Sequence, residues 1–206
     1  MSAVDGSTSN VLRVSQITDT CSDTICAHAQ SFWPTRRREI FALPASEQTR
    51  RAEGLLVASF EGDENDPTHI YMTLGAWRAG CRTCGSREFI LVANSHSPSN
   101  IETLWVSGFY QLTSKSLLDV GHTIPIGRPI APDSTLDHFL VSRPYIFSPN
   151  LEYCELDETV VTRLLWLLPI TGAEAAFRHA QGLEALEQRF EQAPINYLDP
   201  GRVSLA

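Results

Sequence analysis

The sequence lacks the long apolar run that a membrane-spanning helix requires. No hydrophobic stretch approaches the roughly 18 residues needed to cross a bilayer. The first ten residues are polar, without the basic start and apolar core of a secretory signal peptide. We therefore expect a cytoplasmic protein with no membrane attachment. We also expect a disordered tail at residues 1–10 and a single domain at residues 11–206.

Basic residues are scarce as well. The chain has 16 Lys and Arg against 24 Asp and Glu, which gives a formal net charge of -8. Nucleic-acid binding needs Lys and Arg aligned against phosphates, and the one basic run, 36–38, lacks interleaved aromatic residues. We interpret this run as a solvated strand edge and expect no nucleic-acid partner. An acidic surface favours solubility or a basic protein partner.

Cysteine is rare, and its five copies are odd in number, which argues against a disulfide framework. The spacing of Cys81 and Cys84 suits one side of a tetrahedral zinc site, but no second pair exists. His69 and His96 flank the same predicted hairpin and are the remaining candidate ligands. A redox role would need a helix N-terminus at the first cysteine, whereas this pair precedes a strand. We interpret the pair as two ordinary thiols and expect neither a metal nor a cofactor.

The motifs of common catalytic sites are also missing. The sequence has no Gly-x-Ser-x-Gly nucleophile elbow and no glycine-rich phosphate loop. Asp119 with His122 and Asp137 with His138 have acid–histidine spacing, but no nucleophile is implied near either pair. We interpret both histidines as structural and predict that the chain is not an enzyme. The less favoured alternative is a metal-dependent enzyme that uses the cysteine pair or the Asp119/His122 region.

Hydrophobic periodicity predicts strands and helices that mix without strict alternation, which favours an α+β fold over a doubly wound one. We expect a mixed, largely antiparallel central sheet with packed helices. The clearest amphipathic helix is Ile101–Leu112, whose small Gly108 would allow close packing on the sheet. Another helix is predicted at 24–33. The predicted strands are 39–43, 55–60, 69–77, 88–92, 136–141, 151–155 and 160–168.

The last forty or so residues carry the strongest local signals. The apolar run 160–168 predicts a strand buried on both faces and closed by Pro169. Thr171 and Glu174 have the spacing of a capping box. This spacing predicts a short helix that ends near Gly182, followed at once by a second helix.

Three motifs in this region closely resemble the C-terminal signature of the suppressor of fused-like domain family. They read Leu-Trp-Leu-Leu-Pro-Ile-Thr-x-x-Glu at 165–174, Gly-Leu-Glu-Ala-Leu-Glu at 182–187 and Tyr-Leu-Asp-Pro-x-Arg at 197–202. Residues 71–77 and 87–91 are similar to the two central strands of that family. Residues 119–127 and 140–145 resemble segments of its small bacterial members. The resemblance covers about residues 55–202.

The resemblance implies a non-enzymatic protein-binding domain. The eukaryotic namesake of the family sequesters a transcription factor by pairing its strands with an extended peptide. Small bacterial members are commonly proposed as immunity proteins. We therefore predict an immunity protein that neutralises a cognate bacterial toxin, with a regulatory adaptor for another cytoplasmic partner as the alternative. Aromatic residues on irregular segments are typical of binding surfaces. The predicted partner-binding residues are Trp77, His122, Arg143, Tyr145 and Phe147.

Overall fold

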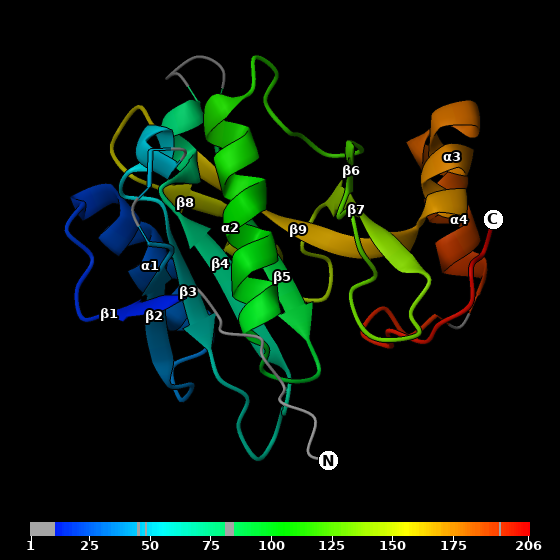
Figure 1. The fold of residues 1–206 in the computed structure, drawn as a ribbon, viewed down its shortest axis with the longest axis horizontal. Coiled ribbons are helices and arrows are strands. Elements are labelled where there is room, and N and C mark those ends of the chain that lie inside the picture. Colours follow the sequence, from blue (N-terminus) through cyan, green and yellow to red (C-terminus); the bar gives the residue numbers. More distant parts are fainter. Residues whose placement is uncertain (1–10, 45, 48, 81–84, 194) are drawn as a thin grey trace, which may run out of the picture.

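The structure of the protein is a computed structural model that describes residues 11–206 apart from positions 45, 48, 81–84 and 194. The expected tail at residues 1–10 and the Cys81/Cys84 pair therefore lie outside the described residues. Within them, a large sheet is covered by helices on both of its faces (Figure 1).

Five strands form the first half of this sheet. They are β1 (Leu12–Val14), β2 (Arg38–Ala42), β3 (Leu56–Phe60), β4 (His69–Leu74) and β5 (Ser86–Ala93). Each strand pairs antiparallel with the next one along the chain. Such a meander needs only short connections, and it includes the predicted hairpin of β4 and β5.

The second half of the sheet is built around β9 (Val161–Thr171), which lies parallel to β5. The other strands are antiparallel: β7 (Leu136–Ser142) pairs with β9, β6 (Thr123–Pro125) with β7, and β8 (Tyr153–Glu155) with the beginning of β9. β5 and β9 form the one parallel pair among the described strands. The prediction of a mixed, largely antiparallel sheet in an α+β fold is therefore confirmed.

Two hydrophobic cores lie on opposite faces of the sheet, and alternate residues of β5 reach one or the other. α2 (Pro98–Thr113) covers the first core. The second core is covered by α1 (Thr20–Phe32), α3 (Gly172–Gln181) and α4 (Leu183–Gln192). A Cβ atom on Gly108 of α2 would lie 3.0 Å from Leu55 Cδ1 and 3.1 Å from Thr73 Cγ2. The close packing predicted for Gly108 is confirmed.

Pro169 does not close the last strand, contrary to the prediction, because β9 continues to Thr171. The carbonyl oxygen of Pro169 accepts a hydrogen bond from Arg202 Nη2 at 3.0 Å. The backbone nitrogen and oxygen of Pro169 therefore both point away from β7. On that side the pairing of β9 with β5 has already ended at Trp166. A residue without an N–H group is therefore tolerated inside the strand.

Other element boundaries also differ from the predictions. The strand predicted at 151–155 begins only at Tyr153, because the chain before it forms the 3₁₀ helix η3 (Pro149–Leu151). β4 ends at Leu74, and the chain turns at Gly75, with φ of 109°, into the 3₁₀ helix η2 (Ala76–Ala79). Trp77 therefore lies in a helical turn and not at the end of a strand. α1 begins at Thr20, earlier than predicted, because the Asp19 carboxylate accepts hydrogen bonds from the first free backbone amides.

The basic run at 36–38 is only partly solvated. Arg36 is 6% exposed, and its Nη2 lies 2.5 Å from Asp66 Oδ2. Its guanidinium also donates to the backbone carbonyls of Thr68 and Asp66. Arg36 therefore ties the 61–67 turn to the core, and only its two neighbours fit the predicted solvated edge.

Candidate functional site

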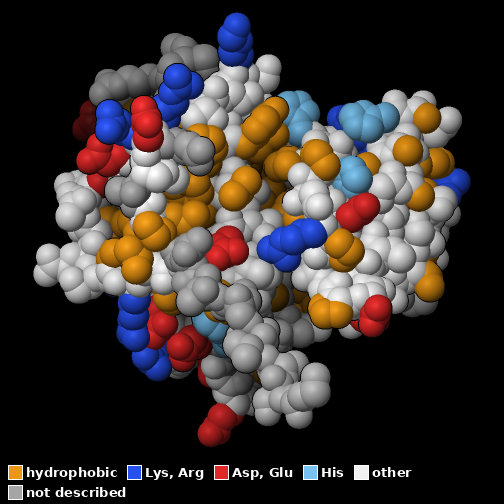
Figure 2. Space-filling view, in the orientation of Figure 1, with side chains coloured by type: hydrophobic (Ala, Val, Ile, Leu, Met, Phe, Trp, Pro, Cys, Tyr) orange, Lys and Arg blue, Asp and Glu red, His pale blue; other side chains and the backbone are white. Residues whose placement is uncertain are grey.

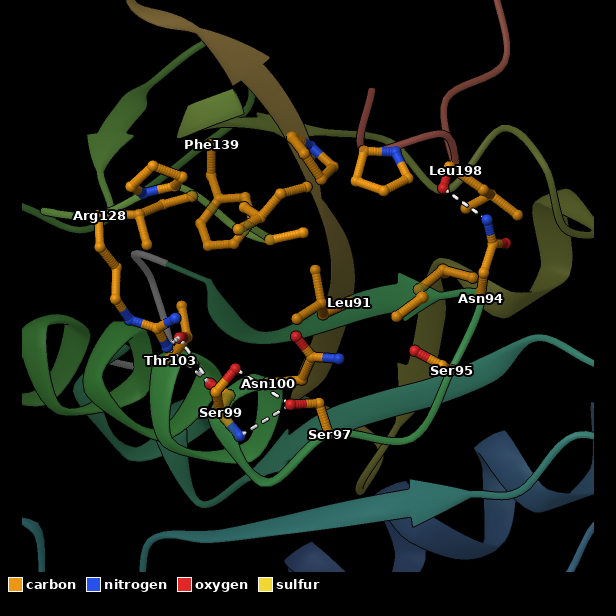
Figure 3. A pocket seen from close by; sticks show the side chains of 18 of the residues that line it. Leu91, Asn94, Ser95, Ser97, Ser99, Asn100, Thr103, Arg128, Phe139 and Leu198 are labelled. Carbon is orange, nitrogen blue, oxygen red and sulfur yellow. Dashed lines mark hydrogen bonds between the residues drawn. The ribbon is translucent and has the colours of Figure 1, made fainter. Parts of the chain in front are cut away.

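β5 and β9 pair at one end and separate at the other, and we call this arrangement the β5–β9 fork. Their paired residues run from Ser86 opposite Thr162 to Ile90 opposite Trp166. β5 then continues to Ala93 and β9 to Thr171 without further pairing between them. A cavity of about 550 Å³ opens at this point, and Leu91, Pro169 and Phe139 of β7 are among the residues that line it (Figure 3).

One wall of this cavity is polar and the other is largely apolar. The polar wall comes from the segment after β5 and the first turns of α2, with Ser97, Asn100 and Thr103. The opposite wall comes from residues 126–133 and from the C-terminal segment with Tyr197 and Leu198. The cavity thus lies where four segments from distant parts of the sequence meet.

A second cavity of about 520 Å³ adjoins the first between α2 and β6. The two cavities share Thr103, Ile126, Arg128 and Phe139, so they lie side by side, and we call the two together the α2 groove. Val106 and Tyr110 of α2 border its second half and are 56% and 48% exposed. Hydrophobic side chains gather over α2 and toward β6 on this face of the molecule (Figure 2).

Arg128 connects the two sides of the groove. Its Nη2 donates to Thr103 Oγ1 at 2.9 Å and to the carbonyl oxygen of Ser99 at 3.2 Å, both on α2 (Figure 3). The salt bridges among the described residues include none to Arg128. The guanidinium is therefore held in place while its charge has no partner in this part of the chain.

A buried ion pair holds the C-terminal wall of the groove. Arg202 Nη1 and Nη2 each lie 2.7 Å from an oxygen of Glu174, which is 0% exposed. Burial acts to raise the pKa of Glu174, but the bonds from Arg202 and from the backbone amides of Thr171 and Leu205 outweigh it. They hold the pKa of Glu174 below its ordinary value. The same carboxylate completes the predicted capping box with Thr171, which is confirmed.

This ion pair places the segment that lines the groove. Asn94 Nδ2 donates to the carbonyl oxygen of Leu198 at 2.8 Å, and Ser134 Oγ donates to that of Pro200 at 2.6 Å. The segment therefore crosses the open end of the fork and is attached on both sides. The Thr-x-x-Glu and Asp-Pro-x-Arg motifs thus have a physical role, because their Glu174 and Arg202 build one wall of the groove.

The other end of the fork is closed by charged side chains. Asp119 lies 2.6 Å from Arg87 Nη2 of β5 and 3.1 Å from Arg163 Nη1 of β9. Arg163 Nη2 also lies 2.5 Å from Glu152 Oε1. Partial burial acts to raise the pKa of Asp119, but the two guanidinium groups and the amide of Val120 hold that pKa below its ordinary value.

The structure does not bring the five predicted partner-binding residues together. Trp77 is half-buried near the start of α1, where its Nε1 donates to Ser22 Oγ at 3.3 Å. Phe147 packs against Trp33, just beyond the other end of α1, at 5.2 Å between ring centroids. His122 is exposed on the loop before β6. None of the five predicted residues lines either cavity of the groove.

Arg143 and Tyr145 lie with Phe147 on the loop after β7. Both are exposed, Tyr145 by 58%. The Tyr145 hydroxyl donates to Glu187 Oε1 of α4 at 2.7 Å. Glu187 therefore links α4 to the loop after β7. This loop stays a second candidate surface, separate from the groove.

The Asp119/His122 pair does not have the arrangement of a base and its orienting acid. The backbone amide of Asp119 donates to His122 Nδ1 at 3.1 Å, while the Asp119 carboxylate is bound to Arg87 and Arg163. His122 is therefore a loop histidine satisfied by backbone, as predicted.

The second acid–histidine pair forms but has no nucleophile in contact. His138 Nδ1 lies 2.7 Å from Asp137 Oδ1, and no hydroxyl or thiol in the described residues hydrogen-bonds to His138. A hydroxyl–imidazole contact that the sequence did not suggest joins Thr123 Oγ1 to His179 Nε2 at 3.0 Å. Arg178 Nη1 lies 3.5 Å from the other ring nitrogen, His179 Nδ1. No carboxylate in the described residues hydrogen-bonds to His179, so this contact lacks the acid that orients a catalytic base.

The remaining metal candidates are His69 and His96, whose ring centroids lie 5.8 Å apart. His69 pairs with Ala93, at the opposite end of the hairpin from the connection between Gly80 and Gly85. The two histidines therefore flank the β4–β5 hairpin as predicted, at the end where the two strands are open. Within the described ranges, no group of three or more His, Cys, Asp or Glu is arranged to hold a metal ion. No helix there is long and apolar enough to cross a membrane.

Comparison with known proteins gives a consistent result. The family model described as Suppressor of fused protein (SUFU) matches residues 51–203. A putative SUFU homolog from Neisseria gonorrhoeae FA 1090 has a similar crystal structure, with a TM-score of 0.78 and 30% identity over 90% of this chain and 96% of that chain. None of the curated proteins matched the chain.

Two further solved structures are similar in fold alone. A chain of the Sufu–Fu complex has a TM-score of 0.67 and 14% identity, over 89% of this chain and 91% of that one. Drosophila Suppressor of Fused has a TM-score of 0.66 and 13% identity, over 88% of this chain and 50% of that one.

Proposed function

The chain belongs to the suppressor of fused family, and we propose that it is a non-enzymatic protein-binding domain whose α2 groove takes up an extended segment of a partner protein. The observation that carries this proposal is the β5–β9 fork. The pairing of the two strands stops at Ile90 and Trp166, and both strands run on with a long depression beside them. Unpaired strand edges of this kind accept an added strand.

The lining of the groove supports a protein ligand. Apolar side chains from four segments face the depression, and polar groups on α2 border it. Val106 and Tyr110 add exposed apolar surface that a folded monomer does not cover. The solved complex of a family member, Sufu with Fu, is in line with a protein partner.

We propose further that the partner is a cognate bacterial toxin and that the chain acts as an immunity protein in the cytoplasm. The net charge of -8 supports a basic partner such as a nuclease domain. Occupation of the groove by a segment of the toxin would hold the two proteins together and block the active site of the toxin.

Coexpression with the protein encoded beside it tests this proposal. Cells that express the neighbouring protein alone should stop growing, and the chain should restore growth and copurify with it in a fixed ratio. Val106→Arg places a charge on the groove wall and should abolish both effects. The matched control is Val161→Arg, because Val161 is 42% exposed on β9 and lines neither cavity.

The alternative is an adaptor that sequesters a cytoplasmic protein other than a toxin. The adaptor would be favoured if the neighbouring protein is not toxic, binds the chain, and no longer binds the Val106→Arg variant. Equal loss of binding with both variants would contradict the groove as the site. Loss with Tyr145→Ala but not with Val106→Arg would move the site to the loop after β7.

A further inference from the structure

Arg128 is the one ionised side chain that lines both cavities of the α2 groove. Glu102 lines only the second cavity and Asp133 only the first. Neither carboxylate forms a salt bridge with Arg128 within the described residues. On a chain with a net charge of -8, the centre of the groove therefore carries an unpaired positive charge.

The geometry around Arg128 favours binding of a carboxylate over simple charge attraction. The hydrogen bonds from Arg128 to Thr103 and Ser99 both come from Nη2 and hold the guanidinium against α2 (Figure 3). Nη1 and Nε make no hydrogen bond in the described part of the chain, so each still has an N–H group free to donate. Because both bidentate edges of a guanidinium include Nη2, a carboxylate here accepts one charge-assisted hydrogen bond, from Nη1 or from Nε. Because the side chain is already held, little of its conformational entropy is lost on binding.

We propose that the α2 groove selects an extended segment of a partner protein in which an Asp or Glu is flanked on both sides by apolar residues. This inference rests on the proposed function, since it names the kind of segment that the groove takes up. The acidic side chain lies on Arg128, where the two cavities meet. The apolar side chains on either side enter the first cavity, beside Leu91 and Tyr197, and the second cavity, beside Val106 and Phe139.

Charge complementarity decides between this segment and a basic one. The acidic surface as a whole attracts basic proteins over long range. At the junction of the two cavities, however, the charge of the bound residue is selected by Arg128, the nearest unpaired charge. A Lys or Arg at the junction would meet Arg128 and be repelled. A basic toxin would therefore bind through an acidic segment of its own.

Selection from a displayed library of random peptides on the full chain tests the proposal. The natural chain should enrich peptides with Asp or Glu between apolar residues. Arg128→Glu should enrich peptides with Lys or Arg at the corresponding position. The matched control is Arg51→Glu, the same charge reversal at an exposed arginine that lines neither cavity, which should leave the acidic preference unchanged.

The selected peptide is then synthesised in two forms that differ only in the acid and its amide. Fluorescence anisotropy should show that the amide form binds the natural chain about tenfold more weakly, as expected for a lost charge-assisted hydrogen bond. On Arg128→Glu this order should reverse, with the amide form binding more tightly than the acid form, because the new carboxylate repels the acid. Circular dichroism of each variant confirms that the fold is kept.

The outcomes separate the two proposals. Enriched peptides without an acidic residue that compete for the groove and fail on Val106→Arg would overturn this inference and leave the proposed function standing. An acidic preference that survives Arg128→Glu, or that is lost with Arg51→Glu, would overturn it as well. No enrichment on the natural chain would contradict both proposals. Self-association that Arg128→Glu abolishes would assign the groove to a second copy of the chain instead.

Discussion

Two buried glutamates mark the two ends of the β5–β9 fork, and they differ in their partners. Glu88 lies on β5 opposite Leu164, in the paired end of the fork. Glu174 follows β9 at the open end. Both are 0% exposed. Within the described residues, Glu88 accepts hydrogen bonds from neutral groups, among them the Thr73 hydroxyl and the amides of Gly75 and Trp77. Glu174 is paired with the guanidinium of Arg202.

The partner decides the charge state. Burial raises the pKa of Glu88 to about 7, because neutral donors offset only part of the cost of removing a carboxylate from water. Burial acts in the same direction on Glu174, yet the guanidinium of Arg202 outweighs it and lowers the pKa of Glu174. The comparison teaches that residue type and burial together do not determine ionisation.

The largest effect on stability is expected from removing the ion pair of Glu174 and Arg202 at the open end of the fork. Glu174→Ala leaves the guanidinium of Arg202 buried without its counter-ion, which costs about 3–5 kcal/mol in proteins. We expect a loss of that size in the free energy of unfolding, measured by urea titration. Glu187→Ala on the exposed side of α4 is the control and should cost about 1 kcal/mol or less. Equal losses would show that the ion pair does not hold the C-terminal wall.

The pH dependence of Glu88 gives the second largest effect. Its pKa rises from 4.5 in the unfolded chain to about 7 in the folded one, so the folded state binds the proton more tightly. Stability from this group is therefore present in full below pH 4.5 and falls as the pH rises toward 7, by about 3 kcal/mol at most.

Glu88→Gln should remove this slope, because the amide does not titrate. The measurement is the difference in unfolding free energy between the two proteins from pH 4.5 to 7.5, in which other titrating groups cancel. The sign reverses at Glu174, whose lowered pKa contributes stability that is lost as the pH falls below its ordinary range. Parallel curves for the natural chain and Glu88→Gln would contradict the assignment.

A smaller effect is expected at the closed end of the fork. Asp119→Asn removes the negative charge shared by Arg87 and Arg163, but the side chain is 40% exposed and water screens it. We expect a loss of about 1 kcal/mol that shrinks in high salt. Asp137→Asn, at a side chain that is 45% exposed, is the control. A loss of stability that does not depend on salt would indicate that Asp119 stabilises the fold through the geometry of its hydrogen bonds and not through its charge.

The smallest effect on stability is expected in the groove itself. Val106→Arg should change the free energy of unfolding by no more than about 0.5 kcal/mol, because Val106 is 56% exposed. Thermal unfolding measures this change. A loss well above that value would mean that Val106 supports the core, and the binding experiments would then need Tyr110→Arg instead.

Local patterns were sufficient for much of the fold. The capping box of Thr171 and Glu174 was read correctly, because it depends on neighbours within a few residues. The close packing of Gly108 was read from its place on the apolar face of its helix, although its contacts, Leu55 and Thr73, lie far away in sequence. Pro169 was misread as the end of a strand. A proline is tolerated there because β5 no longer pairs with that side of β9, and the local sequence of β9 does not show this. Arg36 was misread as solvated because its partner, Asp66, lies on a different turn.

The candidate site depended far less on local patterns. Aromatic residues on a proline-rich loop suggested Tyr145 and Phe147, but Phe147 packs against Trp33 and Tyr145 is bound to Glu187. Arg128 had no signal, because only its contacts with Ser99 and Thr103 distinguish it from any other surface arginine.

The sequence by itself therefore determined most of the strands and helices, the capping box that begins α3, and the family. These features follow from hydrophobic period, capping chemistry and short motifs, which act between near neighbours in the chain. Only the tertiary structure decided where β5 and β9 separate, which arginine neutralises Glu174 and which arginine lies unpaired in the groove. Those outcomes join residues far apart in sequence, and the energy of a buried charge depends on whichever group the fold places beside it.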